Sequence, residues 1–600
     1  MVCKGYSKRN LQFILYDVLD VVSLTKKDYF AKHNRENFDI MLEVAEDIAD
    51  KCLRPYFKES DKNPPQLING RVKVHRSLHD YYKTFCSAGL LASTFDEKLG
   101  GSQVPKSVYA AVDFIIGNAH NGYEMFTSLS VGAARLIVSF GSDLLIKTYA
   151  ERILAGEWAA AMCLTEPQAG SALSAIRTIA KPQSDGSFKI RGQKVFISGG
   201  DHDITNNIVH LVLARIEGAQ EGAKGISLFV VPVKRLKDGS DLVQNDVISA
   251  GIYHKMGQRS TPAMHLDFGS NDDCYGFLVG EQGKGLGYMF QMMNTARLGI
   301  GLAGSFIASS AYYASLQYAK VRYQGKSARP NENYDGQTLI INHPDVRRML
   351  FLQKAITEGC LALVMQCYYY DDLLKTCAPS ERQRYSDLLE LLTPVAKTYG
   401  AEMGIVSVNN GLQVLGGYGY TEDFVLEQLA RDIRIMSIYE GTTGIQSRAL
   451  LGREMPANNK RSFDLWIAEV SSTIMVAQQS DLLTTYGDWL LKEVRELALT
   501  SEHLLSINNK GVEEVFLSDA NLYMEAFGCV SVGWQWLNQG IVAAKRLKEN
   551  SSDVDKNFYL SKLETMRFFF HYELRKTGGL HERLRDETVI TVRKDQEVLI

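Results

Sequence analysis

The sequence is poor in the features that mark secreted, zinc-binding and membrane proteins. Its nine cysteines form no CxxC pair and no Cys/His spacing typical of a zinc site. No apolar run approaches the roughly 20 residues of a membrane span, and the N-terminal stretch lacks the basic-then-apolar layout of a signal peptide. These absences predict reduced, mostly buried thiols, no transmembrane segment and a cytoplasmic location.

The chain also lacks an excess of charge of either sign. Its 66 Lys and Arg residues nearly balance 69 Asp and Glu residues, which leaves a net charge of -3 at pH 7. Such a composition gives no electrostatic case for nucleic acid as a partner, so any anion site has to be local.

Nucleotide-binding loops are missing as well. No GxGxxG follows a strand-like run, and Gly283-Lys284-Gly285 lacks the Ser or Thr of a P-loop. Nicotinamide and nucleoside triphosphate chemistry are therefore disfavoured. The segment Asp201-His202-Asp203 could suggest a metal, but it lies in a Gly- and Asn-rich connection, and we interpret it as a solvated turn.

What the chain does contain is material for about three or four structural units. Apolar residues recur at helical spacing over most of its length, whereas one region has short β-branched runs separated by Gly, Asp and Asn. The pattern predicts a mainly α protein with a central β-barrel or sandwich. The expected parts are an N-terminal extension (1–34), a helical domain (35–158), a β domain (159–276), a second helical domain (277–455) and a C-terminal helical domain (462–600).

Two short segments qualify this division. The extension carries an apolar set too short to fold alone, so we expect it to dock on the body of the protein or on a partner subunit. The polar segment from Pro456 to Arg461 predicts a linker. Strands of the β domain are expected around 188–190, 194–198, 208–213, 226–231 and 264–268.

One carboxylate stands out by its position. Glu440 follows an apolar run that ends at Tyr439 and precedes a turn that begins with Gly441-Thr442. Apolar neighbours disfavour the charged form and raise the pKa of a carboxyl toward working pH, and glycine lets the backbone turn sharply against a ligand. Glu440 is therefore a candidate base, although a Glu in such a place is more often a helix-terminal or surface residue.

The richest polar segment runs from Met162 to Ser171, where the first helical domain meets the β domain. Thr165 and Ser171 flank a Pro/Gly turn. Free backbone amides in such a turn could bind a planar heteroaromatic ring or a phosphate. An ordinary tight loop is the alternative.

Several such segments precede Glu440 in a fixed order: the turn at 162–171, the strand Phe196-Ile197-Ser198, the segment Arg322-Tyr323-Gln324-Gly325, and Gln413-Val414-Leu415-Gly416-Gly417. Together they resemble the acyl-CoA dehydrogenase family over about residues 36–452. The N-terminal extension, the Thr-Glu-Pro-Gln-Ala-Gly-Ser form of the turn and the C-terminal unit are similar to the long subfamily that contains 3-methylmercaptopropionyl-CoA dehydrogenase.

The resemblance implies a helical domain, a β domain and a four-helix domain that bind FAD. Thr165 and Ser198 would hydrogen-bond the polar edge of the flavin ring. Arg322 would cross to the FAD pyrophosphate of another subunit, so the chain is expected to be at least a homodimer. The expected cofactor-binding residues are Met162, Leu164, Thr165, Gly170, Ser171, Phe196, Ile197, Ser198, Arg322, Gln324, Gln413, Gly416, Gly417, Thr442 and Gly444.

The implied substrate is an acyl-CoA thioester. Glu440 matches the base that removes the pro-R α-proton while the β-hydrogen leaves as hydride to flavin N5. Arg297 looks like the residue facing the adenine-phosphate end of CoA, with a purely structural helix position as the alternative. The expected substrate-binding residues are Ser171, Asn294, Arg297, Tyr439, Glu440 and Gly441.

The resemblance also implies the electron acceptor, an electron-transferring flavoprotein. An acyl-CoA oxidase that uses oxygen, a flavin monooxygenase on the same scaffold and a non-catalytic acyl-CoA or FAD-binding protein remain alternatives. Two departures from the family pattern, Ala172 in place of Asp and Gly444 in place of Gln or Glu, put the cofactor contacts of those positions in doubt. Neither removes the base.

Overall fold

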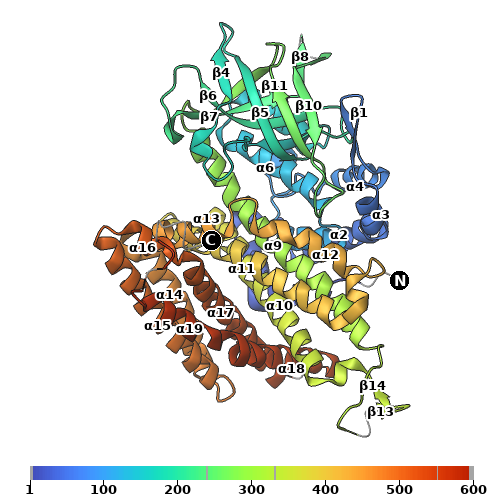
Figure 1. Cartoon of the computed structure of the whole chain (residues 1–600), viewed down its shortest axis with the longest axis vertical. Coiled ribbons are helices and arrows are strands. Elements are labelled where there is room, and N and C mark those ends of the chain that lie inside the picture. The colour runs from blue at the N-terminus through green and yellow to red at the C-terminus, as the bar shows by residue number, and fades with distance from the viewer. Residues whose placement is uncertain (1–3, 238–240, 330–332, 550–551, 589, 593–600) are drawn as a thin grey trace. The chain divides into compact units, whose positions relative to one another are not determined.

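The structure is a computed structural model that describes residues 4–237, 241–329, 333–549, 552–588 and 590–592 (Figure 1). It divides into two compact units. The first unit is His33–Ala296, and the second unit combines Cys3–Lys32 with Arg297–Ile600. The N-terminal extension therefore packs with the C-terminal half of the chain, which agrees with the expectation that it docks on the body of the protein.

Helices open the first unit, as the apolar spacing predicts. Asn34 caps the first long helix through reciprocal hydrogen bonds with Asn37. Phe38 and Leu42, four residues apart on one face of that helix, are buried. The helices of this region include α2 (Arg35–Ile48), α4 (Arg76–Ser87), α5 (Lys106–Ala119) and α6 (Glu124–Phe140).

Eight strands of the first unit form one mixed sheet (Figure 1). Its hydrogen-bonded order is β10-β11-β5-β12-β7-β6-β3, and β4 pairs with both β5 and β6. The expected β-barrel is thus an eight-stranded sheet in which β4 joins two other strands. The strands are β3 (Ala159–Cys163), β4 (Ile179–Pro182), β5 (Phe188–Ser198), β6 (Ile208–Ile216), β7 (Ile226–Pro232), β10 (Val247–Ile252), β11 (Ala263–Phe268) and β12 (Tyr275–Val279).

The five runs predicted as strands are all strands, but the runs at 188–190 and 194–198 belong to one strand, β5. Strand β7 is buried along its whole length, and β6 nearly so. A strand covered on both faces needs apolar residues at successive positions. The continuous apolar runs of the sequence therefore mark the centre of this sheet.

The prediction of a solvated turn at Asp201-His202-Asp203 is wrong. Asp201 and His202 are only 3% and 1% exposed. Asp201 accepts a hydrogen bond from the backbone N–H of Val72 at 2.9 Å and pairs with Arg71 at 3.1 Å. The segment ties the hairpin that carries Val72 and Arg71 to the sheet, so its polar atoms are used inside the protein.

Three long helices dominate the middle of the chain: α9 (Gly285–Ala319), α10 (Pro344–Thr376) and α11 (Arg382–Leu415). Helices α9 and α11 touch backbone to backbone within the second unit. A Cβ atom on Gly304 would lie 2.2 Å from the carbonyl oxygen of Gly400, and one on Gly301 would lie 2.6 Å from that of Ala396. Glycine is therefore required where these helices cross.

Helix α10 is the one described helix long and apolar enough to cross a membrane by length and composition. Its most apolar window is 89% buried inside the structure. Burial of this kind is usual for a core helix, and α10 packs along α11 in the second unit (Figure 1).

The C-terminal region is helical, as predicted, with α14 (Ala457–Ala477), α15 (Thr484–Asn509), α17 (Ala520–Lys548) and α18 (Asp553–Phe568). At the predicted linker, the backbone leaves the helical conformation, with positive φ at Asn458, Asn459 and Lys460. Lys562 of α18 is buried and donates hydrogen bonds to Glu358 and to Asn10. This lysine fastens the N-terminal extension to α10 and α18.

The prediction of reduced, mostly buried thiols is confirmed for the described cysteines. All of them are free. Five are buried: Cys163, Cys274, Cys360, Cys367 and Cys529.

Candidate functional site

The polar turn at 162–171 depends on one buried carboxylate. Glu166 is 3% exposed. It accepts hydrogen bonds from Lys194 Nζ at 2.9 Å, from the backbone N–H groups of Arg177 and Thr178, from the Thr178 hydroxyl and from the Gln168 amide. Lys194 is itself fully buried and also donates to the Leu164 carbonyl at 3.0 Å. A buried ion pair therefore fixes the turn.

Burial alone would raise the pKa of the Glu166 carboxyl. The positive charge of Lys194 and the hydrogen bonds from Thr178 and Arg177 outweigh burial and hold this pKa at about 2. Glu166 stays ionised at any working pH. Such a group suits a structural anchor and cannot exchange protons with a substrate.

Strand β5 is distorted next to this turn. Val195 and Phe196 together face one residue of β11, His265, and the φ of Phe196 is 58°. A β-bulge of this kind re-aims a side chain. Phe196 is 62% exposed and stacks on Tyr253, with ring centroids 4.4 Å apart. The Val195 N–H donates to the Thr165 carbonyl at 2.9 Å, so the turn and the bulge adjoin.

The two hydroxyls expected at the polar edge of the flavin are those of Thr165 and Ser198. Both residues are half-buried, and neither hydroxyl has a hydrogen-bond partner within the described ranges. The other expected residues of this group are Met162 and Leu164, which are half-buried, Ile197, which is buried, and Gly170 and Ser171, which are exposed.

Glu440 lies on a strained turn of the second unit. Its φ is 54° and that of Gly441 is 90°, both in the left-handed region. Gln446 Nε2 donates to the Glu440 carbonyl at 3.0 Å, and Lys397 Nζ donates to the Gly441 carbonyl at 2.9 Å. A Cβ atom on Gly441 would lie 2.5 Å from Gln446 Nε2. Tertiary contacts therefore hold the turn, and position 441 requires glycine.

The Glu440 carboxylate is half-buried and has no hydrogen bond or ion pair with any described residue. Burial raises its pKa above the ordinary value for a glutamate, and the positive charges of Arg297 and Lys397 oppose that rise. Arg297 is 6% exposed and Lys397 is fully buried. A carboxylate with a raised pKa that no donor occupies is a stronger proton acceptor than an ordinary glutamate.

The crossing of α9 and α11 accounts for the two cations. Arg297 lies four residues before Gly301 on α9, and Lys397 lies three residues before Gly400 on α11. Residues three or four apart share a helix face, so each cation stands one turn from a glycine contact. The close approach of the two backbones brings both charges to the turn formed by Glu440 and Gly441, called the base turn below after the expected role of Glu440.

The other residues expected around Glu440 or the substrate lie on α13 (Thr443–Ala449), on the segment before Glu440 and on α9. Thr442 caps α13 by accepting a hydrogen bond from the Ile445 N–H at 3.3 Å. Gly444 lies in the first turn of this helix. The Tyr439 hydroxyl donates to Met436 Sδ at 3.2 Å. Asn294 is half-buried on the part of α9 that belongs to the first unit.

The residues expected at the pyrophosphate and adenosine ends of the cofactor are exposed at two segments of the second unit. Arg322 and Gln324 follow α9, and the Gln324 N–H donates to a carbonyl on the following hairpin at 2.9 Å. Gln413 lies near the end of α11, and Gly416 and Gly417 follow it. All five side chains or backbones are open to solvent.

Aromatic rings connect these two segments. Tyr318 of α9 contacts the rings of Tyr418 and Phe424. Tyr420 is 94% exposed. The two segments therefore lie together on one face that carries uncovered aromatic area.

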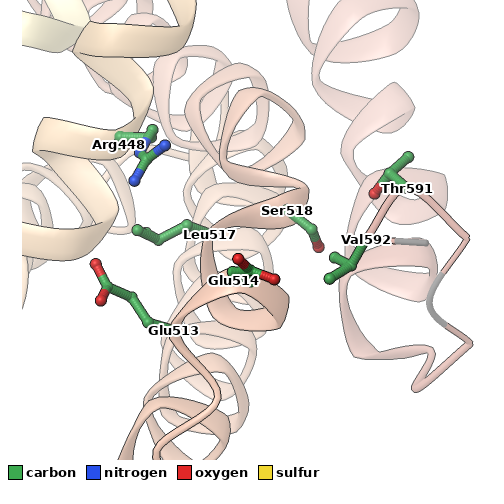
Figure 2. Close-up of a pocket in the computed structure, with 7 residues that line it drawn as sticks. All are labelled: Arg448, Glu513, Glu514, Leu517, Ser518, Thr591 and Val592. Atoms are coloured by element: carbon green, nitrogen blue, oxygen red, sulfur yellow. The ribbon is translucent and has the colours of Figure 1, made fainter. Parts of the chain in front are cut away.

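A separate hollow of about 660 Å³ lies in the second unit. Figure 2 shows Arg448 of α13 on one side of it and two carboxylates, Glu513 and Glu514 of α16 (Glu513–Ser518), on another. It contains none of the expected site residues.

The expected residues of the first unit lie at the turn, at the bulge and, for Asn294, on α9, whereas those of the second unit lie at two places, the turn that carries Glu440 and the exposed face at Arg322 and Gln413. The structure adds four residues that the sequence did not identify: Glu166 as an anchor, Lys194, Lys397 and Gln446. Lys397 had a detectable signal, because it is the one charge between Leu391 and Gly400 in an otherwise apolar and hydroxyl-bearing helical run. Gln446 had none, because its role depends on a turn whose shape the sequence does not give.

Family models match nearly the whole chain. The acyl-CoA dehydrogenase N-terminal, middle and C-terminal domain models match residues 36–157, 161–270 and 283–455, and the acetyl-CoA dehydrogenase C-terminal like model matches 466–592. The chain belongs to the acyl-CoA dehydrogenase family. It is an FAD-dependent acyl-CoA dehydrogenase, and FAD is its cofactor.

Relatives of this acyl-CoA dehydrogenase cover about nine-tenths of its length. A butyryl-CoA dehydrogenase of Syntrophomonas wolfei subsp. wolfei is 34% identical over 579 residues, which cover 94% of both chains. A 3-methylmercaptopropionyl-CoA dehydrogenase of Ruegeria pomeroyi is 34% identical over 539 residues, 89% of this chain and 90% of the relative. The predicted resemblance to the long subfamily is confirmed.

A solved acyl-CoA dehydrogenase of Bacillus anthracis, complexed with FAD, shares the fold with a TM-score of 0.73 at 19% identity, over 93% of each chain. The residues of the present chain fit this cofactor. Thr165 and Ser198 offer uncommitted hydroxyls, and Phe196 offers an exposed ring. Cβ atoms on Gly416 and Gly417 would have no other atom within 4 Å, which leaves room for close approach of a ligand to the backbone.

Proposed function

We propose that this acyl-CoA dehydrogenase converts an acyl-CoA to the trans-2-enoyl-CoA, with Glu440 as the catalytic base. The observation that carries the proposal is an uncommitted carboxylate on a strained turn, next to two buried cations. FAD, when bound, supplies the acceptor for the hydride that leaves the β-carbon.

The Glu440 carboxylate accepts the pro-R α-proton of the thioester. The backbone N–H of Glu440 has no acceptor among the described residues, and we assign it to the thioester oxygen, whose polarisation makes the α-proton acidic. The charge of Arg297 acts on Glu440 and favours the ionised base, so we propose this residue for the thioester end of the substrate in place of the adenine-phosphate end expected from the resemblance. Asn294, Ser171, Tyr439 and Gly441 complete the proposed substrate contacts.

The flavin ring would be held by the turn at 162–171 and by the bulge at 196–198. Thr165 and Ser198 donate their uncommitted hydroxyls, while the remaining residues of both segments supply backbone groups and apolar area. Thr442 and Gly444 follow Glu440 and Gly441 in the chain, and we propose them as further contacts of the cofactor. Arg322, Gln324, Gln413, Gly416 and Gly417 would bind the pyrophosphate and adenosine ends.

We propose that the chain works as at least a homodimer. The exposed aromatic face around Tyr318 and Tyr420, next to the exposed Arg322, supports a second subunit at this place. An electron-transferring flavoprotein is the proposed electron acceptor, and the cytoplasm the proposed location. We keep the domain limits 35–158, 159–276, 277–455 and 462–600 as part of this proposal.

The test is anaerobic reduction of the flavin by acyl-CoA thioesters from short to long. Butyryl-CoA is a first candidate because a full-length relative bears that name. We expect at least one thioester to bleach the flavin and to be converted to the enoyl-CoA. Bleaching by none of them would favour a non-catalytic binding protein.

Oxygen use is decided by a second measurement. The substrate-reduced enzyme is mixed in a stopped-flow instrument with oxygen or with an electron-transferring flavoprotein. We expect reoxidation to be much faster with the flavoprotein. Comparable rates with oxygen would make the chain an acyl-CoA oxidase.

A further inference from the structure

The described part of the chain holds three lysines whose side chains are almost completely buried, and one of them differs from the others. Lys194 pairs directly with Glu166 at 2.9 Å, and Lys562 pairs directly with Glu358 at 2.7 Å. A buried ammonium is costly unless it is paired. Lys397 is fully buried too, yet its hydrogen bond goes to a backbone carbonyl, that of Gly441.

The carbonyl that Lys397 binds lies directly after the proposed base in the chain. Gly441 directly follows Glu440, and Gln446 holds the carbonyl of Glu440 itself at 3.0 Å. Two buried donors therefore fix the two successive peptide groups that follow the base. They leave the carboxylate and the N–H of Glu440 uncommitted. Both groups that the proposed reaction uses are thereby oriented without being occupied.

The charges around Lys397 are few. Glu440 and Glu402 act on it as negative groups and Arg297 as a positive one. Glu402 is occupied in part, because it accepts a hydrogen bond from the Thr443 hydroxyl. Burial lowers the pKa of Lys397 to about 8, so its charge is present at neutral pH and available to Glu440.

We propose that Lys397 is a positioning residue for the base: its ammonium, together with the Gln446 amide, fixes the turn that presents Glu440, and its charge favours the ionised carboxylate. This inference rests on the proposed function of Glu440. The chemistry assigned to Lys397 is electrostatic and conformational, since its buried ammonium donates to the Gly441 carbonyl beside the base.

The charge is tested with FAD-bound Lys397→Met. We expect the maximal rate of anaerobic flavin reduction to fall about 10- to 100-fold, because a base displaced by a fraction of an ångström loses its alignment. The rate is also measured against pH, and its fall at acidic pH reports protonation of the base. This acidic limb of the pH profile should move up by about one pH unit in the variant, because the ionised carboxylate loses a nearby opposite charge. Lys397→Arg keeps the charge and should restore the position of the limb, although with a lower rate than the wild type.

The hydrogen bond from Gln446 to the Glu440 carbonyl is tested separately with Gln446→Leu, which removes a donor and no charge. We expect a lower rate of flavin reduction and an acidic limb at the same pH as in the wild type. Lys562→Met is the matched control for loss of a buried lysine, and we expect it to lower the thermal midpoint and leave the limb in place. An acidic limb at the wild-type pH in Lys397→Met would contradict the electrostatic role of Lys397. A wild-type rate in Gln446→Leu would contradict the role of the turn contacts in positioning Glu440. If Lys397→Met does not fold, Lys397→Gln, which also lacks the positive charge, replaces it in the same measurements.

A second readout does not depend on turnover. The protonated Glu440 carboxyl gives an infrared band that Glu440→Gln removes, and its intensity can be followed against pH in the wild type and in Lys397→Met. We expect the band to persist to higher pH in the variant. If no acyl-CoA reduces the wild-type flavin, the proposed function fails, while this titration still shows whether Lys397 governs the ionisation of Glu440.

Discussion

Glu166 and Glu440 are both shielded carboxylates near a buried lysine, and the fold uses them in opposite ways. Glu166 contacts its lysine directly and accepts further hydrogen bonds from Arg177 and Thr178, which hold its pKa at about 2. Glu440 makes no contact of this kind with a described residue, and burial raises its pKa. The lysine nearest to it binds the neighbouring backbone instead.

The number of donors around a shielded carboxylate thus decides whether it serves the structure or is available for chemistry. A carboxylate saturated with donors is fixed in charge and place, whereas one left without donors keeps its affinity for a proton. What decides between the two outcomes is where the lysine donates: to the carboxylate itself or to a peptide group beside it.

The same Glu→Gln substitution at the two positions should affect different properties of the protein, and the largest effect is expected for Glu440→Gln. We expect flavin reduction by acyl-CoA to fall by about 10³-fold or more, because the general base is lost. Stability should not fall, since the folded pKa of Glu440 is raised and its ionisation opposes folding as the pH rises through that pKa. The measurements are anaerobic stopped-flow reduction, FAD content and the thermal midpoint. Substantial reduction by the variant would contradict the assignment of the base.

Glu166→Gln should do the reverse. It leaves Lys194 buried without its ionic partner, which costs about 3 kcal/mol or more of stability at pH 7. FAD should dissociate more readily, because the turn at 162–171 loosens. Urea unfolding and FAD titration measure both effects, and a fully stable variant with weakened base chemistry would reverse the roles assigned to the two carboxylates.

The pH dependence of that loss has a definite sign. The pKa of Glu166 is about 2 when folded and about 4.5 in its ordinary state, so its ion pair stabilises the folded chain fully above the ordinary value. As pH falls through that window, the unfolded chain takes up the proton first, and the stabilisation is lost. The gap between wild type and Glu166→Gln should therefore narrow on acidification from pH 5 to about pH 3, followed by urea midpoints.

Gly441→Ala probes the turn that presents the base. We expect flavin reduction to fall about 10- to 100-fold, because the new methyl group meets Gln446 Nε2 at 2.5 Å and the φ of 90° is unfavourable for alanine. Gly511→Ala is the control, since Gly511 also has a positive φ, 78°, but nothing within 4 Å of a Cβ atom. That variant should lose some stability and keep the rate. Equal rates in both variants would mean that the contact with Gln446 is unimportant.

Thr442→Ala should have the smallest effect. It removes the cap of α13, which is worth about 1 kcal/mol of stability. Thr442→Ser keeps the capping oxygen and should retain the thermal midpoint. An equal loss of stability in Thr442→Ser and Thr442→Ala would contradict the capping role of the hydroxyl.

Much of this picture was present in the sequence. Helical and strand periodicity predicted the order of elements, and an ordered set of short motifs predicted the family and the base. The prediction that Asp201 lies in a solvated turn, made from its Gly- and Asn-rich surroundings, was wrong. Its carboxylate is instead satisfied by the Val72 N–H and by Arg71, residues far away in the chain. Composition near a residue cannot report a partner that arrives from elsewhere.

The amino-acid sequence supplies the kinds of groups: a glutamate before a glycine, a turn with Thr and Ser, and apolar runs with helical or strand periodicity. What each group does depends on the neighbours that the fold brings to it. The glycine crossing of α9 and α11 brings Arg297 and Lys397 to the base turn, and the bulge in β5 turns Phe196 outward. Charge and burial act through space, so two glutamates of the same chemistry become a structural anchor and, in the proposed reaction, a base, because different neighbours surround them.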